Sequence, residues 1–174
     1  MDKKVLLLTA SLLALIMLVT PVMAVSPKKI PVILAWGSVT NTPAPEDQRR
    51  ITGNAQHGIG ETRTFTDYSI TGGSIALTGG NSIWYGKYNF NLENGRGSKS
   101  WEIIIDFGAG SFEGKMLVHG TFEIRPSGWA MMFPDGVRHA VLQGTGAYKG
   151  WTLVWTHPRV DGTNLDPEAY MLIP

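Results

Sequence analysis

The chain has 174 residues, 15 basic and 14 acidic side chains, 21 glycines and no cysteine. This length predicts one domain with a real core, and the near-zero net charge argues against a nucleic-acid-binding protein, which would need a basic surplus on one face. The absence of cysteine excludes disulfide scaffolds, thiolate zinc sites, cysteine nucleophiles and lipidated-cysteine anchors.

The N-terminus has the features of an export signal. Lys3 and Lys4 form a positive region, an apolar run covers residues 5–19, and Val22-Met23-Ala24 resembles a cleavage site. We predict a signal peptide over 1–24, cleaved after Ala24, and a secreted or extracytoplasmic protein that has no membrane contact after cleavage. The alternative is an uncleaved anchor, although the run is short for a span, which needs roughly 20 residues.

Removal of residues 1–24 changes the composition of what remains. The segment contains one acidic and two basic residues, so the mature chain would have 13 of each and no net charge, and it would keep all 21 glycines. Helices tolerate glycine poorly, at about 1 kcal/mol per interior glycine relative to alanine. Turns and bulges of an antiparallel sheet accommodate it, so the composition favours β structure.

Residues 25–60 predict a leader, a first strand and a loop. A strand is expected over 30–36, with Pro31 at its start or on a sheet edge, and a loop over 42–47. Residues 48–57 show no clear period, and they fit either an irregular strand or a loop.

We expect residues 61–160 to form most of the β domain and residues 161–174 to form a C-terminal tail. Alternating apolar residues mark the strands, with breaks at Gly79-Gly80-Asn81 and a hairpin turn at Asn94-Gly95. A second hairpin is expected across Pro134-Asp135-Gly136.

The alternation of apolar and charged residues is clearest in the run 101–107. Trp101, Ile103, Ile105 and Phe107 share one face, and Glu102 and Asp106 lie on the other. We expect the apolar face to point inward and the two carboxylates to point to solvent.

The whole pattern predicts eight or nine strands at roughly 10-residue spacing and no amphipathic helix. Such a chain forms a closed barrel or a sandwich. We favour an all-β, eight-stranded antiparallel barrel, because closure removes edge strands without disulfides.

Two glycine-rich segments, 110–119 and 146–155, match each other at a spacing of 36 residues. The motif residues Gly144, Gly146, Tyr148 and Gly150, in the order Gly-Thr-Gly-Ala-Tyr-Lys-Gly, overlap the start of the second segment. This motif resembles the C-terminal segment of the dirigent and allene oxide cyclase-like barrels. The resemblance implies an eight-stranded barrel of calycin-like architecture whose interior accepts a small apolar molecule. No catalytic or ligand-orienting residue of that family matches a position here, so none is transferred.

Aromatic residues supply the candidate ligand site. Six tryptophans are present, and their first explanation is a large buried area in a core without disulfides. If the barrel has a cavity, Trp101, Trp151 and Trp155 are expected to line it. No metal site is expected, because the four histidines lack ligand spacing, although His119 and His139 fall on strands that could be neighbours.

Three function classes remain open. The first is a secreted barrel that binds a small hydrophobic ligand, without catalysis and without a cofactor. The second is a cyclase or isomerase of the allene oxide cyclase or dirigent type, whose catalytic residues the sequence does not indicate. The third is a structural or assembly protein of the cell surface, and no oligomeric state is predicted.

Overall fold

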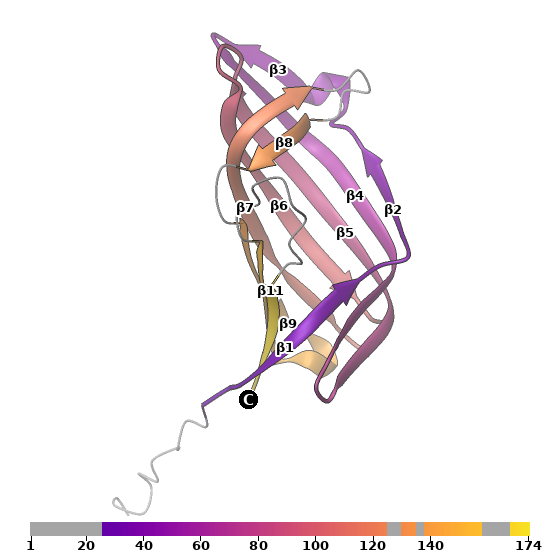
Figure 1. The fold of residues 1–174 in the computed structure, drawn as a ribbon. Coiled ribbons are helices and arrows are strands. Elements are labelled where there is room, and N and C mark those ends of the chain that lie inside the picture. The colour runs from indigo at the N-terminus through magenta and orange to yellow at the C-terminus, as the bar shows by residue number, and fades with distance from the viewer. Residues whose placement is uncertain (1–25, 125–129, 135–137, 158–167) are drawn as a thin grey trace, which may run out of the picture.

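The computed structural model describes residues 26–124, 130–134, 138–157 and 168–174 (Figure 1). The predicted signal peptide over 1–24 lies outside the described residues. Within them, no helix is long and apolar enough to span a membrane. The elements are β1 (Lys28–Ala35), β2 (Ser38–Thr42), η1 (Glu46–Gln48), β3 (Arg49–Thr52), β4 (Ala55–Gly72), β5 (Ile75–Asn91), β6 (Arg96–Asp106), β7 (Ser111–Ile124), β8 (Ala130–Pro134), β9 (Arg138–Gly144), η2 (Gly146–Tyr148), β10 (Thr152–His157) and β11 (Glu168–Ile173).

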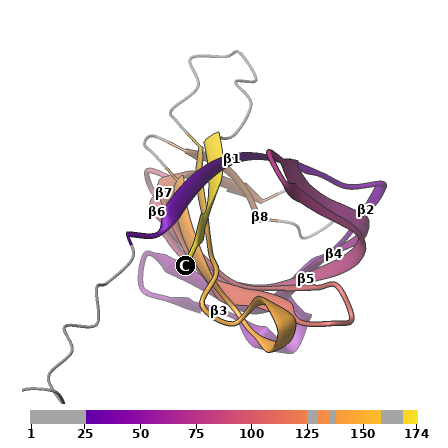
Figure 2. The same ribbon diagram turned by 90° about the horizontal axis from the view of Figure 1, so that it is seen from below.

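Eight of these strands close into a ring in the order β1, β11, β10, β9, β7, β6, β5 and β4, and β4 pairs back with β1 (Figure 2). All neighbouring strands are antiparallel. The predicted eight-stranded antiparallel barrel is therefore confirmed. Strands β2 and β3 add to β4, and β8 adds to β7.

The inner face of the barrel holds the main core, and β6 shows how the sequence builds it. Trp101, Ile103 and Ile105 are buried, whereas Glu102 and Asp106 are exposed, as the alternation predicted. The neighbouring strands contribute in the same way. The other fully buried apolar side chains include Tyr68, Ile70, Phe112, Leu142, Leu153 and Met171.

The break predicted at Gly79-Gly80-Asn81 is wrong, because β5 runs without interruption through these residues. Gly80 is buried, and a Cβ atom at this position would lie 2.6 Å from the ring of Phe107. The glycine leaves room for an aromatic ring against the strand. It does not end the strand.

The hairpin predicted across residues 134–136 is also wrong. A hairpin would pair its two flanking strands with each other, but in the described residues β8 and β9 both pair with β7. Strand β7 is 14 residues long, so its two halves can take different partners end to end. The expected C-terminal tail contains β11, which pairs with both β1 and β10 because Ala169 and Met171 alternate inward into the core.

The motif residues meet the first of the two matching segments at the barrel end opposite β3 and β8 (Figure 1). The Ala147 amide donates to the Ala109 carbonyl at 3.0 Å. The ring of Tyr148 stacks on Phe112 with 5.2 Å between centroids. A Cβ atom on Gly144 would overlap the backbone of Tyr148, and Gly146 and Gly150 have positive φ angles of 55° and 91°. Each residue of the motif thus has a packing role at this end of the barrel.

Candidate functional site

Three charged side chains point into the barrel among its aromatic residues. Glu61 and Arg63 are on β4, and Lys99 is on β6. The pairing of β4 with β5 shifts register between Ile59 and Glu61, and this bulge sets the direction of the side chains that follow it. The alternation after the bulge places Glu61, Arg63 and the core residue Phe65 on one face.

Glu61 and Lys99 form a buried ion pair. Their side chains are 0% and 3% exposed, so both charges have lost most of their hydration. The Lys99 ammonium also lies 4.5 Å from the ring centroid of Trp101, a favourable cation–π distance. A buried ion pair contributes little net stability compared with apolar residues of the same size. Its presence in an aromatic core therefore invites a functional explanation.

The protonation of Lys99 reflects competing influences. Burial lowers the pKa of Lys99 to about 8, the Glu61 carboxylate opposes this shift, and the nearby Arg63 charge adds to it. Below that value the ammonium form predominates. The cluster of Glu61, Arg63 and Lys99 then has two positive charges and one negative charge.

Arg63 lies where the inner face of the barrel meets solvent. Its side chain is only partly buried, and its Nε donates a hydrogen bond to Asn41 Oδ1 of β2 at 2.7 Å. Its guanidinium carbon lies 5.4 Å from the ring centroid of Trp101 and 5.9 Å from that of Trp84. The charged end of Arg63 thus connects the aromatic interior with the β2 side of the barrel.

Strand β2 leaves this part of the inner face open. Directly paired residues in an antiparallel ladder point to the same side, and Asn41 pairs with Arg63 while Val39 pairs with Phe65. Asn41 is nevertheless exposed, and Val39 is 44% exposed. Solvent therefore reaches the inward-facing side of β2.

Aromatic rings form a continuous surface beside the charged cluster. The ring centroid of Trp84 lies 4.9 Å from that of Phe65, 5.9 Å from that of Trp101 and 5.2 Å from that of Trp155. The Trp84 indole donates from Nε1 to Ser82 Oγ at 2.9 Å, which fixes its orientation. Trp36 is 43% exposed and contacts Phe65 edge-on. The surface thus runs from solvent to the buried Trp155.

The structure brings together two of the three tryptophans proposed from sequence. Trp101 and Trp155 both contact Trp84. Trp151 is on the segment before β10 and packs against Tyr148, next to the glycine motif. It has no ring contact with Trp84 among those that the described residues make.

The candidate residues on the outer face do not form a site together with this cluster. Glu102 and Asp106 are exposed, as are His119 and His139. His139 Nδ1 lies 3.2 Å from Thr156 Oγ1, an ordinary surface contact. In the described part of the chain, no three histidine or carboxylate side chains are grouped to hold a metal ion.

Sequence reasoning missed all three charged residues of the cluster. The signal for Lys99 was present, since it alternates with Trp101 and Ile103 on the predicted inner face. Arg63 likewise alternates with Phe65. Glu61 follows a bulge at Gly60, which has a φ angle of 90°. The bulge interrupts the alternation of inward-facing and outward-facing residues along β4, so the sequence pattern does not assign Glu61 to a face.

Lys99 makes a specific prediction for the pH dependence of stability. Its pKa is about 8 in the folded protein, below its ordinary value of 10.5, so between these values the unfolded chain binds more protons and stability rises with pH. We expect the wild type to gain stability relative to Lys99→Met between pH 8 and 9.5. Chemical denaturation at each pH measures the difference, and parallel pH curves for the two proteins would contradict the assignment.

The pH range stops at 9.5 because the buried tyrosines act in the opposite direction. Burial raises the pKa of Tyr68, and burial together with the Glu61 charge raises that of Tyr88. A raised tyrosine pKa means that the folded protein holds the proton longer, so stability falls as the unfolded chain ionises. Below pH 9.5 the contribution of Lys99 is the larger change.

The chain was compared with known proteins at three levels. Neither protein-family models, nor curated proteins, nor solved structures match it. The likeness of its glycine motif to dirigent and allene oxide cyclase-like barrels therefore stays a prediction from sequence. The structure is a closed barrel with a charged and aromatic cluster on its inner face.

Proposed function

We propose that the protein is an exported β-barrel that binds a small molecule with an apolar body and one anionic group. The ligand would enter on the inner face at the exposed Trp36 and extend toward Trp84 and Trp101, with its anionic group at Arg63. The observation that carries the proposal is the position of Arg63, which lies between the aromatic surface and the open side of β2.

The aromatic surface supports an apolar ligand body. Trp36 presents a ring that is 43% exposed and contacts Phe65, and Trp84 and Trp101, which lie edge to face and are nearly fully buried, continue the aromatic cluster behind it. Large rigid rings give a ligand contact area at little cost in side-chain entropy. This arrangement accords with the apolar ligand that the glycine-motif resemblance implies.

The charges support an anionic group on that ligand. Arg63 places a cationic group on the open side of the aromatic cluster, where a ligand carboxylate or sulfonate would meet it. The guanidinium of Arg63 presents several N–H donors in one plane, and its bond to Asn41 holds the fork in place. A charged hydrogen bond in a desolvated site contributes about 1.5–3 kcal/mol.

A pair of matched dyes tests the proposal. 1-Anilinonaphthalene-8-sulfonate and N-phenyl-1-naphthylamine share their rings but differ in the sulfonate. We expect the sulfonate dye to bind the wild type at least about 10-fold more tightly, measured by energy transfer from tryptophan, and Arg63→Gln to remove this preference. Arg96→Gln, at an exposed position on β6, is the matched control and should keep it. Equal affinity of the wild type for both dyes would refute the anionic part of the proposal.

An isomerase or cyclase is the second candidate, because one observation favours it. Glu61 and Lys99 place a carboxylate and an ammonium group in contact beside the proposed ligand position. Such a pair can accept and donate a proton within one turnover. If this activity exists, Glu61→Gln should abolish turnover of a bound ligand while leaving dye binding intact.

A further inference from the structure

A groove on the outer face of the barrel forms a second candidate site. It has a volume of about 270 Å³ and is lined by side chains from four adjacent strands, β3 to β6. The side chains that matter for its chemistry are Arg50, His57, Lys87, Asn89, Ser98 and Ser100. Each of them offers a polar or charged atom to the groove.

The strand register explains why these residues meet. Arg50, His57, Asn89 and Ser98 lie directly opposite one another on successive strands and form one row. Lys87 and Ser100 form the next row, two residues further along. With strands about 4.8 Å apart, the first row spans about 14 Å, which is wide enough for a small polar molecule.

The groove is separate from the inner cluster because residues alternate across the barrel wall. Tyr88 and Lys99 are buried, whereas their neighbours Lys87 and Asn89 are exposed. Gly58 has no side chain, and the ring of Tyr88 occupies the inner space where its Cβ would lie. A ligand in the groove would contact the outside of the wall only.

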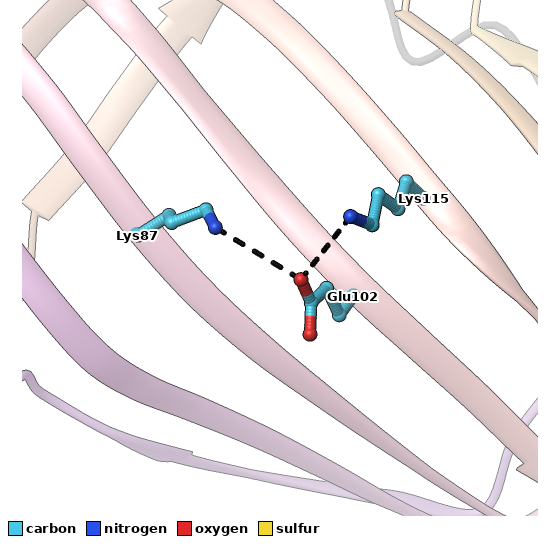
Figure 3. Close-up of polar contacts among 3 residues, drawn as sticks. All are labelled: Lys87, Glu102 and Lys115. Carbon is cyan, nitrogen blue, oxygen red and sulfur yellow. Dashed lines mark ion pairs between the residues drawn. The ribbon is translucent and has the colours of Figure 1, made fainter.

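The groove is positively charged. Arg50 and Lys87 line it, and none of the lining residues in the described part of the chain has a carboxylate. Lys87 also forms an ion pair with Glu102, whose carboxylate lies 3.9 Å from Lys87 and 3.5 Å from Lys115 (Figure 3). One carboxylate is thus shared between two lysines, so it balances only part of their combined charge.

We propose that the groove binds an oxyanion group, a phosphate or sulfate ester on a small polar molecule. Arg50 and Lys87 supply the charge, and Asn89, Ser98 and Ser100 supply neutral donors for the ester and the hydroxyl groups beside it. Ile59 also lines the groove and would contact the carbon atoms of the ligand, but the two cationic and several polar side chains distinguish this ligand from the one proposed for the interior. The same ester chemistry occurs in soluble metabolites and in phospholipid headgroups, which the test separates.

The test compares two substitutions in the groove with one beside it. Glycerol 3-phosphate is titrated into the full chain and binding is followed by calorimetry, and vesicles containing phosphatidylglycerol are used in a parallel sedimentation assay. We expect Arg50→Gln and Lys87→Gln each to weaken binding about 10-fold. Lys115→Gln removes the same charge from the same face, outside the groove, and should change binding less than about 2-fold.

The two assays identify the source of the ester. Binding of glycerol 3-phosphate with the expected pattern of variants indicates a soluble ligand, and the same pattern with vesicles alone indicates a lipid headgroup. An equal effect of Lys87→Gln and Lys115→Gln would show a diffuse charge effect and overturn the site. So would the absence of binding in both assays. Circular dichroism of each variant checks the fold, which these exposed substitutions should not alter.

Discussion

Replacement of Lys99 by methionine is expected to lower the free energy of unfolding by about 3–5 kcal/mol. The substitution removes one member of the buried pair and leaves the Glu61 carboxylate in an apolar interior. Guanidinium chloride denaturation at pH 7 measures the loss. Lys87→Met, which breaks an exposed ion pair of 3.9 Å, is the matched control and should cost less than about 1 kcal/mol.

The double substitution of Glu61→Leu and Lys99→Met distinguishes the stability cost of removing the ion pair from the cost of leaving one buried charge without its partner. With both members of the pair removed, only Arg63 of the cluster stays charged, and its partly exposed side chain keeps its hydrogen bond to Asn41, so stability should return to within about 1 kcal/mol of the wild type or exceed it. If the double variant were as unstable as the sum of the two single variants, the pair would not be coupled. The electrostatic description of the cluster would then be incorrect.

Truncation of Trp84 to alanine is expected to cost about 3–5 kcal/mol, the range for removing a buried large aromatic side chain. Trp84 is 3% exposed and contacts the rings of Phe65, Trp101 and Trp155. Its loss would leave a cavity where four aromatic rings meet. Thermal and chemical denaturation measure the effect.

Trp36→Ala provides the comparison. Trp36 also contacts Phe65, but it is 43% exposed, so its removal takes less apolar area from the core. We expect less than half the cost of Trp84→Ala. Equal costs for the two substitutions would mean that Trp84 is not the centre of the aromatic cluster.

The sequence predicts the fold best where residues alternate without interruption. Trp101, Ile103 and Ile105 identify the inner face of β6, because a strand places every second side chain on the same side. Asn94-Gly95 correctly marks the turn between β5 and β6, where Gly95 has a φ angle of 69°. These local signals carry the barrel prediction.

Other features depend on contacts between distant residues, and local patterns do not reveal them. Gly80 looks like a strand break, but it makes room for the ring of Phe107, which directly follows β6. The hairpin expected across 134–136 fails because β7 is long enough to pair with both flanking strands. Strand β11 is short, and its place between β1 and β10 becomes visible only in the closed barrel.

The candidate site was only partly predictable for the same reason. Two of its tryptophans, Trp101 and Trp155, were identified from strand patterns and aromatic excess. The third tryptophan proposed from sequence, Trp151, lies beside the glycine motif and not in the aromatic cluster. The ion pair joins β4 to β6, two strands that do not pair directly, and only the closed structure shows that Glu61 and Lys99 meet.

The central claim is that a ligand binds on the inner face at the aromatic cluster. Its most direct test is a nitrogen–proton NMR titration of the full chain with decanoate, an apolar chain with one carboxylate, after assigning the indole signals by tryptophan-to-phenylalanine substitution. We predict that the indole signals of Trp84 and Trp101 shift with decanoate and that the signal of Trp151 does not. Unchanged Trp84 and Trp101 signals at saturating decanoate would contradict the claim.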